Sequence, residues 1–269
     1  MKKPLLLVAV LAASLLAMPA PSAIAQARSV WIDDLTWPEV RDAIAAGKST
    51  AIIFVGSSEQ NGPHMAIGKH NVIARYAAQR IAEELGDALV YPVMPFAITG
   101  DAVAKSAHMR FPGSVTLPPE VFSSVVRAVA QSALAAGFKL VAMMGDHGGG
   151  QVEMARLAQA LDAEAKKSGA RVLFVGDLYS KADTEFEAVL AKRGLPTKSE
   201  LHAGIADTSA ILFLGAENWI RKDRIAAANE ATGVQGTPAL ATAELGKIYL
   251  DLKVASAVNQ IKAFRAGVR

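Results

Sequence analysis

Acidic and histidine side chains follow two apolar runs of this sequence that have the length of buried strands. Glu59 and His70 lie in a segment rich in Gly and Pro directly after the run 51–55, and His147 lies in the Gly-rich segment after the run 139–144. In open α/β proteins, ligands bind outside the carboxyl ends of parallel strands. We therefore expect these side chains to meet at one edge of a sheet.

All five histidines fall in such loop-like segments rather than inside a helix or strand pattern: His64, His70, His108, His147 and His202. A single histidine in a loop is usually exposed or hydrogen-bonded to a nearby group. Here Glu59, Asp146 and Asp207 stand close in sequence to three of them. The pattern leaves two interpretations open, which are unrelated loop histidines and a metal or catalytic cluster.

A carboxylate and imidazole nitrogens are ligands of catalytic zinc sites, which leave one position open for water. An ion bound in this way lowers the pKa of its water and polarises a carbonyl group, and amide hydrolysis uses both effects. Glu59, His70 and His147 could supply such a set. The sequence holds no cysteine, so zinc, manganese and iron(II) all suit the available donors.

The elements that must position these residues alternate along the chain. Strands are expected at 51–55, 89–96, 139–144 and 171–175, and the prolines at 92 and 95 in the second indicate a sheet edge or a strand end. Helices are expected at 36–46, 71–85, 120–136, 152–167, 182–193, 207–214 and 239–264. Such alternation predicts an α/β domain with a mostly parallel, doubly wound sheet flanked by helices.

The first 25 residues have the parts of a secretory signal peptide. Two lysines precede an apolar run over residues 5–18, and the small-x-small sequence at 23–25 suits cleavage. The apolar run is too short to span a membrane, although an uncleaved anchor is the alternative. We expect residues 26–269 to form a single domain in the periplasm or outside the cell, without a membrane contact after cleavage.

Composition and motifs exclude several other classes of function. Removing the two leader lysines lowers the formal net charge from +3 to +1, and no basic run or basic–aromatic pattern indicates a nucleic-acid partner. The Gly-rich segment 145–150 fits neither a phosphate-binding loop nor a dinucleotide fingerprint. The G-x-S-x-G motif of serine hydrolases is absent. The segment 110–113 fits either a pocket wall or a structural turn.

Four segments together resemble the creatininase (creatinine amidohydrolase) family. They are Gly-Ser-Ser-Glu-Gln-Asn-Gly-Pro-His at 56–64, His-Met-Arg-Phe-Pro-Gly at 108–113, Gly-Asp-His-Gly-Gly at 145–149 and His-Ala-Gly-Ile-Ala-Asp-Thr-Ser at 202–209. The resemblance implies a three-layer α/β domain that uses one or two divalent metals to hydrolyse an amide or formamide. It also implies a small-molecule substrate and a homo-oligomer, often a hexamer.

The resemblance carries over to individual residues only in part. Glu59 and His147 match metal ligands of the family, and His202 matches the histidine that assists catalysis. Asn61 replaces a histidine ligand and His70 replaces a bridging aspartate. Asp207 and Gly149 each stand where the family has a glutamate.

These departures imply a single metal. A carboxylate can bridge two cations, whereas an imidazole offers one nitrogen to one metal. The implied one-metal set is Glu59, His70 and His147, with zinc favoured over manganese and iron.

The leading hypothesis is therefore a metal-dependent hydrolase that cleaves the C–N bond of a cyclic or small amide with a metal-activated water. His202 would carry the proton, because the ordinary pKa of histidine lies near neutrality, and Asp207 would assist it. Substrate contacts or support of the ligands are expected from four other residues: Asn61, His64, His108 and Asp146.

Two alternatives stay open. The substituted ligands favour a non-catalytic periplasmic protein that binds a metal or solute, whereas the retained Glu59, His147 and His202 favour an enzyme. A lactone or ester hydrolase could use the same metal site. The changed ligand set argues against creatinine itself as the substrate.

Overall fold

The structure is a computed structural model that describes residues 29–198, 200–215 and 217–267. The expected signal peptide, residues 1–25, lies outside the described residues. Over the described part of the chain, no helix is both long enough and apolar enough to cross a membrane.

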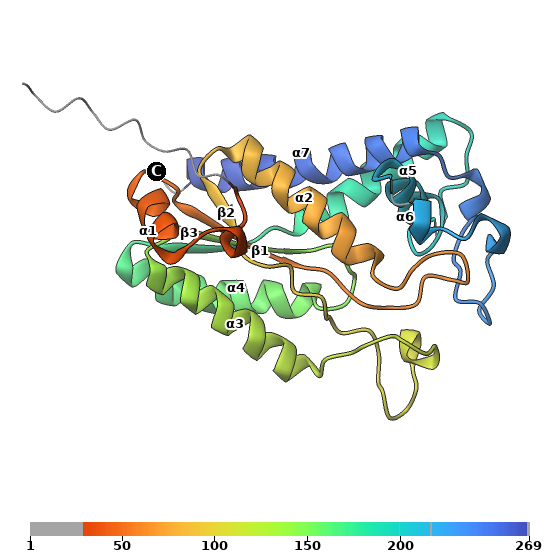
Figure 1. Cartoon of the computed structure of the whole chain (residues 1–269), viewed down its shortest axis with the longest axis horizontal. Coiled ribbons are helices and arrows are strands. Elements are labelled where there is room, and N and C mark those ends of the chain that lie inside the picture. The colour runs from red at the N-terminus through yellow and green to blue at the C-terminus, as the bar shows by residue number, and fades with distance from the viewer. Residues whose placement is uncertain (1–28, 199, 216, 268–269) are drawn as a thin grey trace, which may run out of the picture.

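Four parallel strands form the centre of the fold (Figure 1). They are β1 (Thr50–Val55), β2 (Ala88–Val90), β3 (Leu140–Gly145) and β4 (Arg171–Phe174). Their order across the sheet is β2-β1-β3-β4, so β1 lies between β2 and β3. The expected parallel, doubly wound sheet is confirmed, and β2 lies at an edge of the sheet and ends before Pro92.

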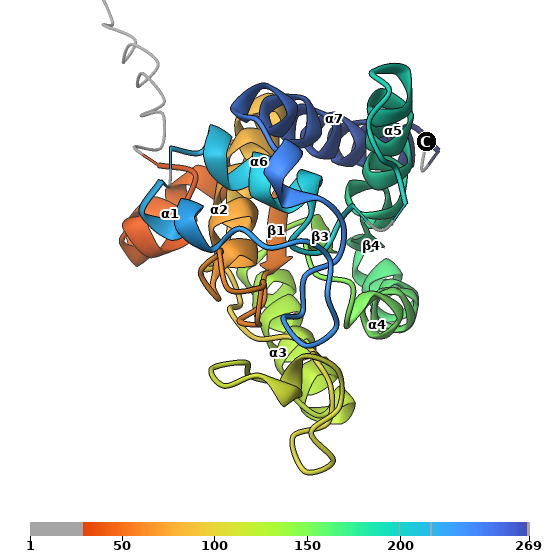
Figure 2. The same ribbon diagram turned by 90° about the vertical axis from the view of Figure 1, so that its right-hand side faces the viewer.

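Helices cover both faces of this sheet. They are α1 (Trp37–Ala45), α2 (Lys69–Leu85), α3 (Pro119–Ala136), α4 (Gln151–Ala165), α5 (Ser180–Lys192), α6 (Ile205–Phe213) and α7 (Ala243–Gly267). Short 3-10 turns lie at Ile32–Asp34, Ala107–Arg110, Lys166–Ser168, Gly176–Leu178, Glu217–Trp219, Lys222–Arg224 and Pro238–Leu240. Helices α1, α3 and α4 pack on one face, and α2 and α7 pack on the other (Figures 1 and 2).

Side chains from the continuous apolar run of β1 contribute to two hydrophobic clusters, one on each face of the sheet. Ile53 and Val55 belong to the cluster under α3 and α4, whereas Ile52 and Phe54 belong to the cluster under α2 and α7. Successive side chains of a strand point to opposite faces, and a parallel strand covered on both sides is therefore apolar throughout. This is why the run 51–55 predicted its strand correctly.

The order of the strands creates a crevice between β1 and β3. After β1 the chain crosses to β2 on one side, and it later enters β3 on the other side. Val55 pairs with Gly145, so both strands end at the same level. The loops that follow β1 and β3 therefore start side by side, which is where doubly wound sheets bind their ligands.

A third apolar cluster lies around α6 and the first half of α7, and it fixes α6 beyond the carboxyl ends of the strands. It includes Phe186, Ile211 and Leu250. Gly246 of α7 lets the backbone of α6 approach closely, because a Cβ atom there would collide with the carbonyl group of Ser209.

Some element boundaries differ from those expected. The strand expected over 89–96 ends at Val90, and Met94 adds only an isolated bridge to Val55. Helix α2 begins at Lys69 rather than at residue 71, with Gly68 as its N-cap. His70 therefore lies in the first turn of a helix and not in a loop.

Gly246→Ala should lower the free energy of unfolding by about 1–3 kcal/mol, because overpacking would push α6 away from α7. Gly267 lies on the same helix, and a Cβ atom there would meet no neighbour within 4 Å. Gly267→Ala is thus the matched control, and its effect should stay within about 0.5 kcal/mol. Urea denaturation of both variants measures the difference, and equal stability would contradict the close approach of these helices.

Candidate active site

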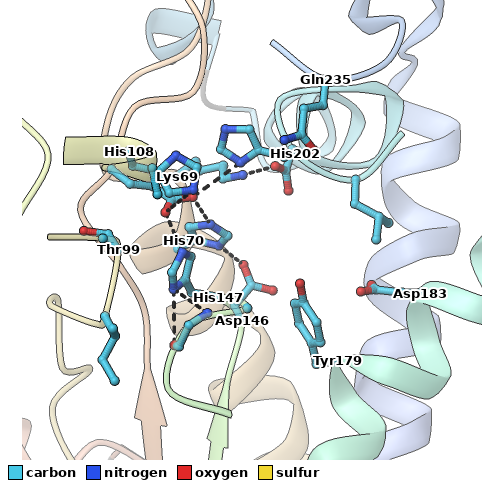
Figure 3. Close-up of a pocket in the computed structure, with 18 of the residues that line it drawn as sticks. Lys69, His70, Thr99, His108, Asp146, His147, Tyr179, Asp183, His202 and Gln235 are labelled. Atoms are coloured by element: carbon cyan, nitrogen blue, oxygen red, sulfur yellow. Dashed lines mark hydrogen bonds and ion pairs between the residues drawn. The ribbon is translucent and has the colours of Figure 1, made fainter. Parts of the chain in front are cut away.

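A cavity of about 430 Å³ opens at the carboxyl ends of β1 and β3 (Figure 3). Ionisable side chains from loops and helices distant in sequence line much of it. Four of the five histidines are among them: His70, His108, His147 and His202. The sequence-based expectation that these loops meet at one edge of the sheet is therefore confirmed.

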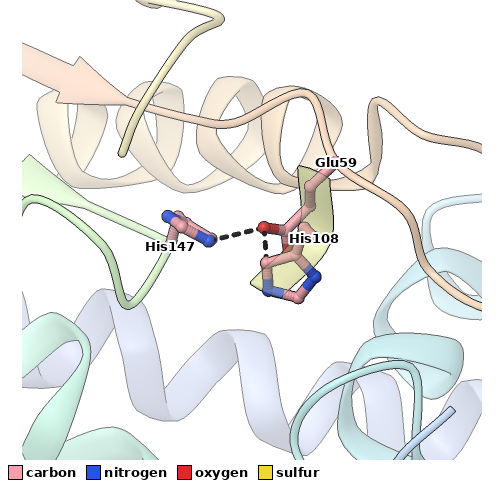
Figure 4. Close-up of side chains that lie close together, drawn as sticks. All are labelled: Glu59, His108 and His147. Carbon is pink, nitrogen blue, oxygen red and sulfur yellow. Dashed lines mark ion pairs between the residues drawn. The ribbon is translucent and has the colours of Figure 1, made fainter. Parts of the chain in front are cut away.

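The carboxylate of Glu59 lies at the centre of these imidazoles. Its Oε2 lies 2.5 Å from His147 Nε2 and 3.5 Å from His108 Nε2 (Figure 4). Its Oε1 lies 2.9 Å from His70 Nε2 and 3.5 Å from His202 Nδ1. The Glu59 side chain is fully buried.

Burial raises the pKa of Glu59, but attraction to His70 and His147 and the hydrogen bond with His70 outweigh it. The pKa of Glu59 consequently lies well below its usual range. The site therefore presents an ionised carboxylate at neutral pH.

The donor atoms around Glu59 fit a divalent cation. One oxygen of Glu59 and one nitrogen each of His108 and His147 lie within 4.8 Å of one another. Glu59 Oε2 is buried and makes no hydrogen bond to the described residues. The backbone N–H of Gly149 donates to His147 Nδ1 at 3.0 Å, which orients the ring so that Nε2 faces Glu59.

The positions of His70 and His108 differ from those expected for the ligand set inferred from the sequence. Both nitrogens of His70 face carboxylates, with Nε2 2.9 Å from Glu59 Oε1 and Nδ1 2.6 Å from Asp146 Oδ2. His108 was expected to contact substrate or to support the ligands, and one of its ring nitrogens lies within 4.8 Å of donor atoms of Glu59 and His147. The role of His70 as a ligand stays a prediction.

His202 lies in an environment that suppresses its charge. Gln60 Nε2 donates to His202 Nε2 at 2.9 Å, which leaves the ring proton on Nδ1, toward Glu59. Burial and the nearby ammonium of Lys69 lower the pKa of His202 to about 2. The role of His202 in proton transfer stays a prediction.

Asp207 forms a buried ion pair with Lys69 rather than standing free in the cavity. Its Oδ2 also accepts a hydrogen bond from the backbone N–H of Ala203 at 3.0 Å. Ala203 has a φ of 52°, which is an uncommon conformation for a residue with a side chain. Asp207 thereby fixes the turn that presents His202.

Asn61 and His64 are not among the residues that line the cavity. The Asn61 amide donates to the carbonyl groups of Glu59 and Ala66, at 2.9 and 3.0 Å. His64 Nε2 lies 3.2 Å from Thr208 Oγ1 of α6. Both side chains are buried, and they hold the loop that carries Glu59 in place.

Residues 33–261 match the sequence family Creatininase, described as creatinine amidohydrolase. The chain belongs to the creatininase family. It is 27% identical to creatinine amidohydrolase of Pseudomonas putida over 120 residues, which is 45% of each chain. It is 26% identical to the mycofactocin precursor peptide peptidase of Mycobacterium tuberculosis over 238 residues, which cover 78% of this chain and 83% of the peptidase. Both names describe hydrolases of C–N bonds.

Solved creatininases share the fold. A mutant creatininase of the Zn-Zn type superimposes with a TM-score of 0.73 at 22% identity, covering 88% of this chain and 98% of that one. A creatininase with Mn gives a TM-score of 0.72 at 24% identity over the same shares. At these identities the likeness establishes the three-layer α/β fold alone.

Behind the histidines of this creatininase-family chain lies a buried network of charges. Asp146 Oδ1 lies 3.0 Å from Lys253 Nζ, which lies 3.7 Å from Asp183 Oδ1. Tyr249 donates its hydroxyl proton to Asp183 at 2.7 Å. Asp146 was expected to support the ligands, and it does contact His70.

Sequence reasoning missed Lys69, Lys253 and Asp183. A signal existed for Lys253, because it falls on the helical stripe formed by Tyr249, Leu250 and Val254. A lysine on the buried face of a helix indicates a buried partner.

Burial alone raises the pKa of Asp146, but Lys253 and His70 outweigh it and lower the pKa to about 2. Burial lowers the pKa of Lys253, while Asp146 and Asp183 raise it above its usual value. The pair is therefore ionised at neutral pH and holds His70 from behind.

Lys253→Met should lower the free energy of unfolding by about 3–5 kcal/mol at pH 7, because Asp146 would be left as a buried charge without its ammonium partner. The deficit should shrink as the pH falls from about 4 to 2, because Asp146 then becomes protonated in both proteins. Urea denaturation across this pH range measures it. Exposed Lys262→Met is the control, and a deficit independent of pH would contradict the ion pair.

Proposed function

We propose that this chain is a metal-dependent hydrolase of an amide C–N bond, with one divalent cation held by Glu59, His108 and His147. The buried, ionised Glu59 carboxylate beside two imidazole nitrogens carries the proposal, because this donor set suits a catalytic zinc site. Similar structures described with zinc and with manganese support these two metals ahead of iron.

A divalent cation held by these residues would polarise the carbonyl group of an amide and lower the pKa of a water molecule. The protein then has to orient the amide and its own ligands. The Gln60 amide lies within 3.1 Å of His108 Nδ1 and 2.9 Å of His202 Nε2, so it fixes both rings. Neutral His202 offers its Nδ1–H as a hydrogen-bond donor beside Glu59.

We further propose that the protein is exported and matures near residue 26, and that it works in the periplasm or outside the cell. The support is the leader-like sequence of residues 1–25. A homo-oligomer, by family resemblance a hexamer, is part of the same proposal.

A second cavity favours an elongated amide, such as a short peptide, over a small cyclic one. It has a volume of about 500 Å³ and shares Ala107, His108 and Gln235 with the first cavity. Arg110 lines this second cavity. Its guanidinium nitrogen lies 2.9 Å from a carboxylate oxygen of Glu230, and the group lies over the ring of Phe111. The name of the mycobacterial relative, a precursor peptide peptidase, agrees with this substrate class.

Replacing the ligands should separate their roles. Glu59→Gln, His147→Ala and His108→Ala should each abolish stoichiometric zinc binding, since each removes a donor. His70→Ala should weaken zinc binding only about 10–100-fold, as expected for a residue that orients a ligand. Metal analysis after gel filtration and chelator competition measure both effects. Loss of zinc in His70→Ala with retention in His108→Ala would restore the ligand set inferred from the sequence.

Turnover should distinguish the substrate classes. With zinc or manganese bound, we expect kcat/KM to be at least about tenfold higher for short peptides than for formamides or lactams, because a longer substrate gains binding energy in the second cavity. Arg110→Ala should raise KM for peptides and leave the small amides unchanged. Cleavage of lactones or esters alone would favour the alternative enzyme, and metal binding without any turnover would favour a binding protein.

A further inference from the structure

Two buried lysines are paired with carboxylates that line the cavity, and Lys69 lines the cavity itself. Lys69 and Lys253 are both 1% exposed. Lys69 pairs with Asp207, and Lys253 pairs with Asp146. Two of the carboxylates that face the cavity are thus already neutralised by ammonium groups of the protein.

Lys69 lines the cavity, whereas Lys253 contacts it through Asp146. Lys69 is the first residue of α2 and directly precedes His70. Figure 3 shows its side chain beside His108 and His202. Its ammonium group donates to Asp207 Oδ2. Burial lowers the pKa of Lys69 to about 8 against the attraction of Glu59 and Asp146, so its side chain is mostly an ammonium at pH 7. This charge opposes protonation of His108 and His202.

Other features leave little room for a second metal ion. A side chain at position 149 would collide with the Ile98 carbonyl group, so no ligand can project from Gly149. The Asn61 amide is bound to backbone carbonyl groups of its own loop. Among the described residues, the carboxylate and imidazole donors close enough for one ion are those of Glu59, His108 and His147.

We propose that the Lys69 ammonium, anchored by Asp207, is the second cation of this cavity. It limits the site to one divalent ion, opposes the binding of that ion, and lies where it can stabilise negative charge on the carbonyl oxygen of a substrate. This inference rests on the proposed function, because it presupposes a divalent ion at Glu59.

The direction of the expected change in zinc affinity follows from charge alone. A fixed positive charge beside a cation site weakens the binding of a cation, and a fixed negative charge strengthens it. Lys69 and Asp207 therefore act on zinc affinity in opposite directions, and their effects cancel when both are removed.

The test is a double-mutant cycle on the zinc dissociation constant, measured with a competing chelator. Lys69→Met should tighten zinc binding by at least about tenfold, and Asp207→Asn should weaken it by a similar factor. The Lys69→Met/Asp207→Asn protein should return to within about threefold of the wild type, because the net charge is restored. Lys69→Arg keeps the charge and should stay near the wild type. In the same preparations, turnover of any substrate found for the wild type should fall in Lys69→Met.

A purely structural role for Lys69 would give the opposite result. Lys69→Met would then loosen zinc binding, and the second substitution would not restore it. Wild-type protein that binds two zinc ions per chain at saturation would also overturn the inference. If Lys69→Met fails to fold, as judged by circular dichroism, Lys69→Gln takes its place in the cycle, and Asp207→Asn with unchanged or tighter binding contradicts the inference by itself.

Failure of the inference can be told apart from failure of the proposed function. If the wild type binds no zinc, or if Glu59→Gln binds zinc as tightly as the wild type, the proposed metal site is wrong. If zinc binding depends on Glu59 but does not tighten in Lys69→Met, only the role of Lys69 is wrong.

Discussion

An ionised carboxylate without solvent contact is the constraint on which the rest of this site depends. Moving such a charge out of water is costly unless positive charge or several hydrogen bonds compensate it. Glu59 is fully buried, and imidazole nitrogens face both of its oxygens. A neutral imidazole compensates a carboxylate only in part, and the cation proposed at Glu59 Oε2 would complete the balance. The surrounding loops, helices and lysines can be understood as the means of holding this arrangement.

The fold meets this constraint by bringing three distant parts of the chain to one edge of the sheet. Equal strand ends at Val55 and Gly145 start the loops of Glu59 and His147 side by side. The turn that carries His202 directly precedes helix α6, which lies beyond the carboxyl ends of the strands. The close approach at Gly246 fixes α6 against α7. Helix α7 also supplies the lysine that supports the site from behind. Packing far from the cavity thereby sets the distances within it.

The sequence predicted the parts of this structure that depend on local pattern. Buried parallel strands are continuous apolar runs, and residues just after them, such as Glu59 and His147, must lie at the edge of the sheet. The place of His108 could not be predicted, because it lies in an irregular segment whose path depends on tertiary packing. The ion pair between Lys69 and Asp207 could not be predicted either, because a contact between residues so distant in sequence produces no periodic sequence pattern. The pKa of His202 depends on burial and on Lys69, which the sequence around residue 202 does not indicate.

The most direct measurement is a crystal structure of the zinc-loaded protein with anomalous scattering at the zinc edge. A single peak per chain should lie about 2.0–2.2 Å from a Glu59 oxygen and from the Nε2 atoms of His108 and His147. Two peaks, or one peak coordinated by His70 in place of His108, would contradict the arrangement described for this cavity. No peak near Glu59 would contradict the metal site altogether.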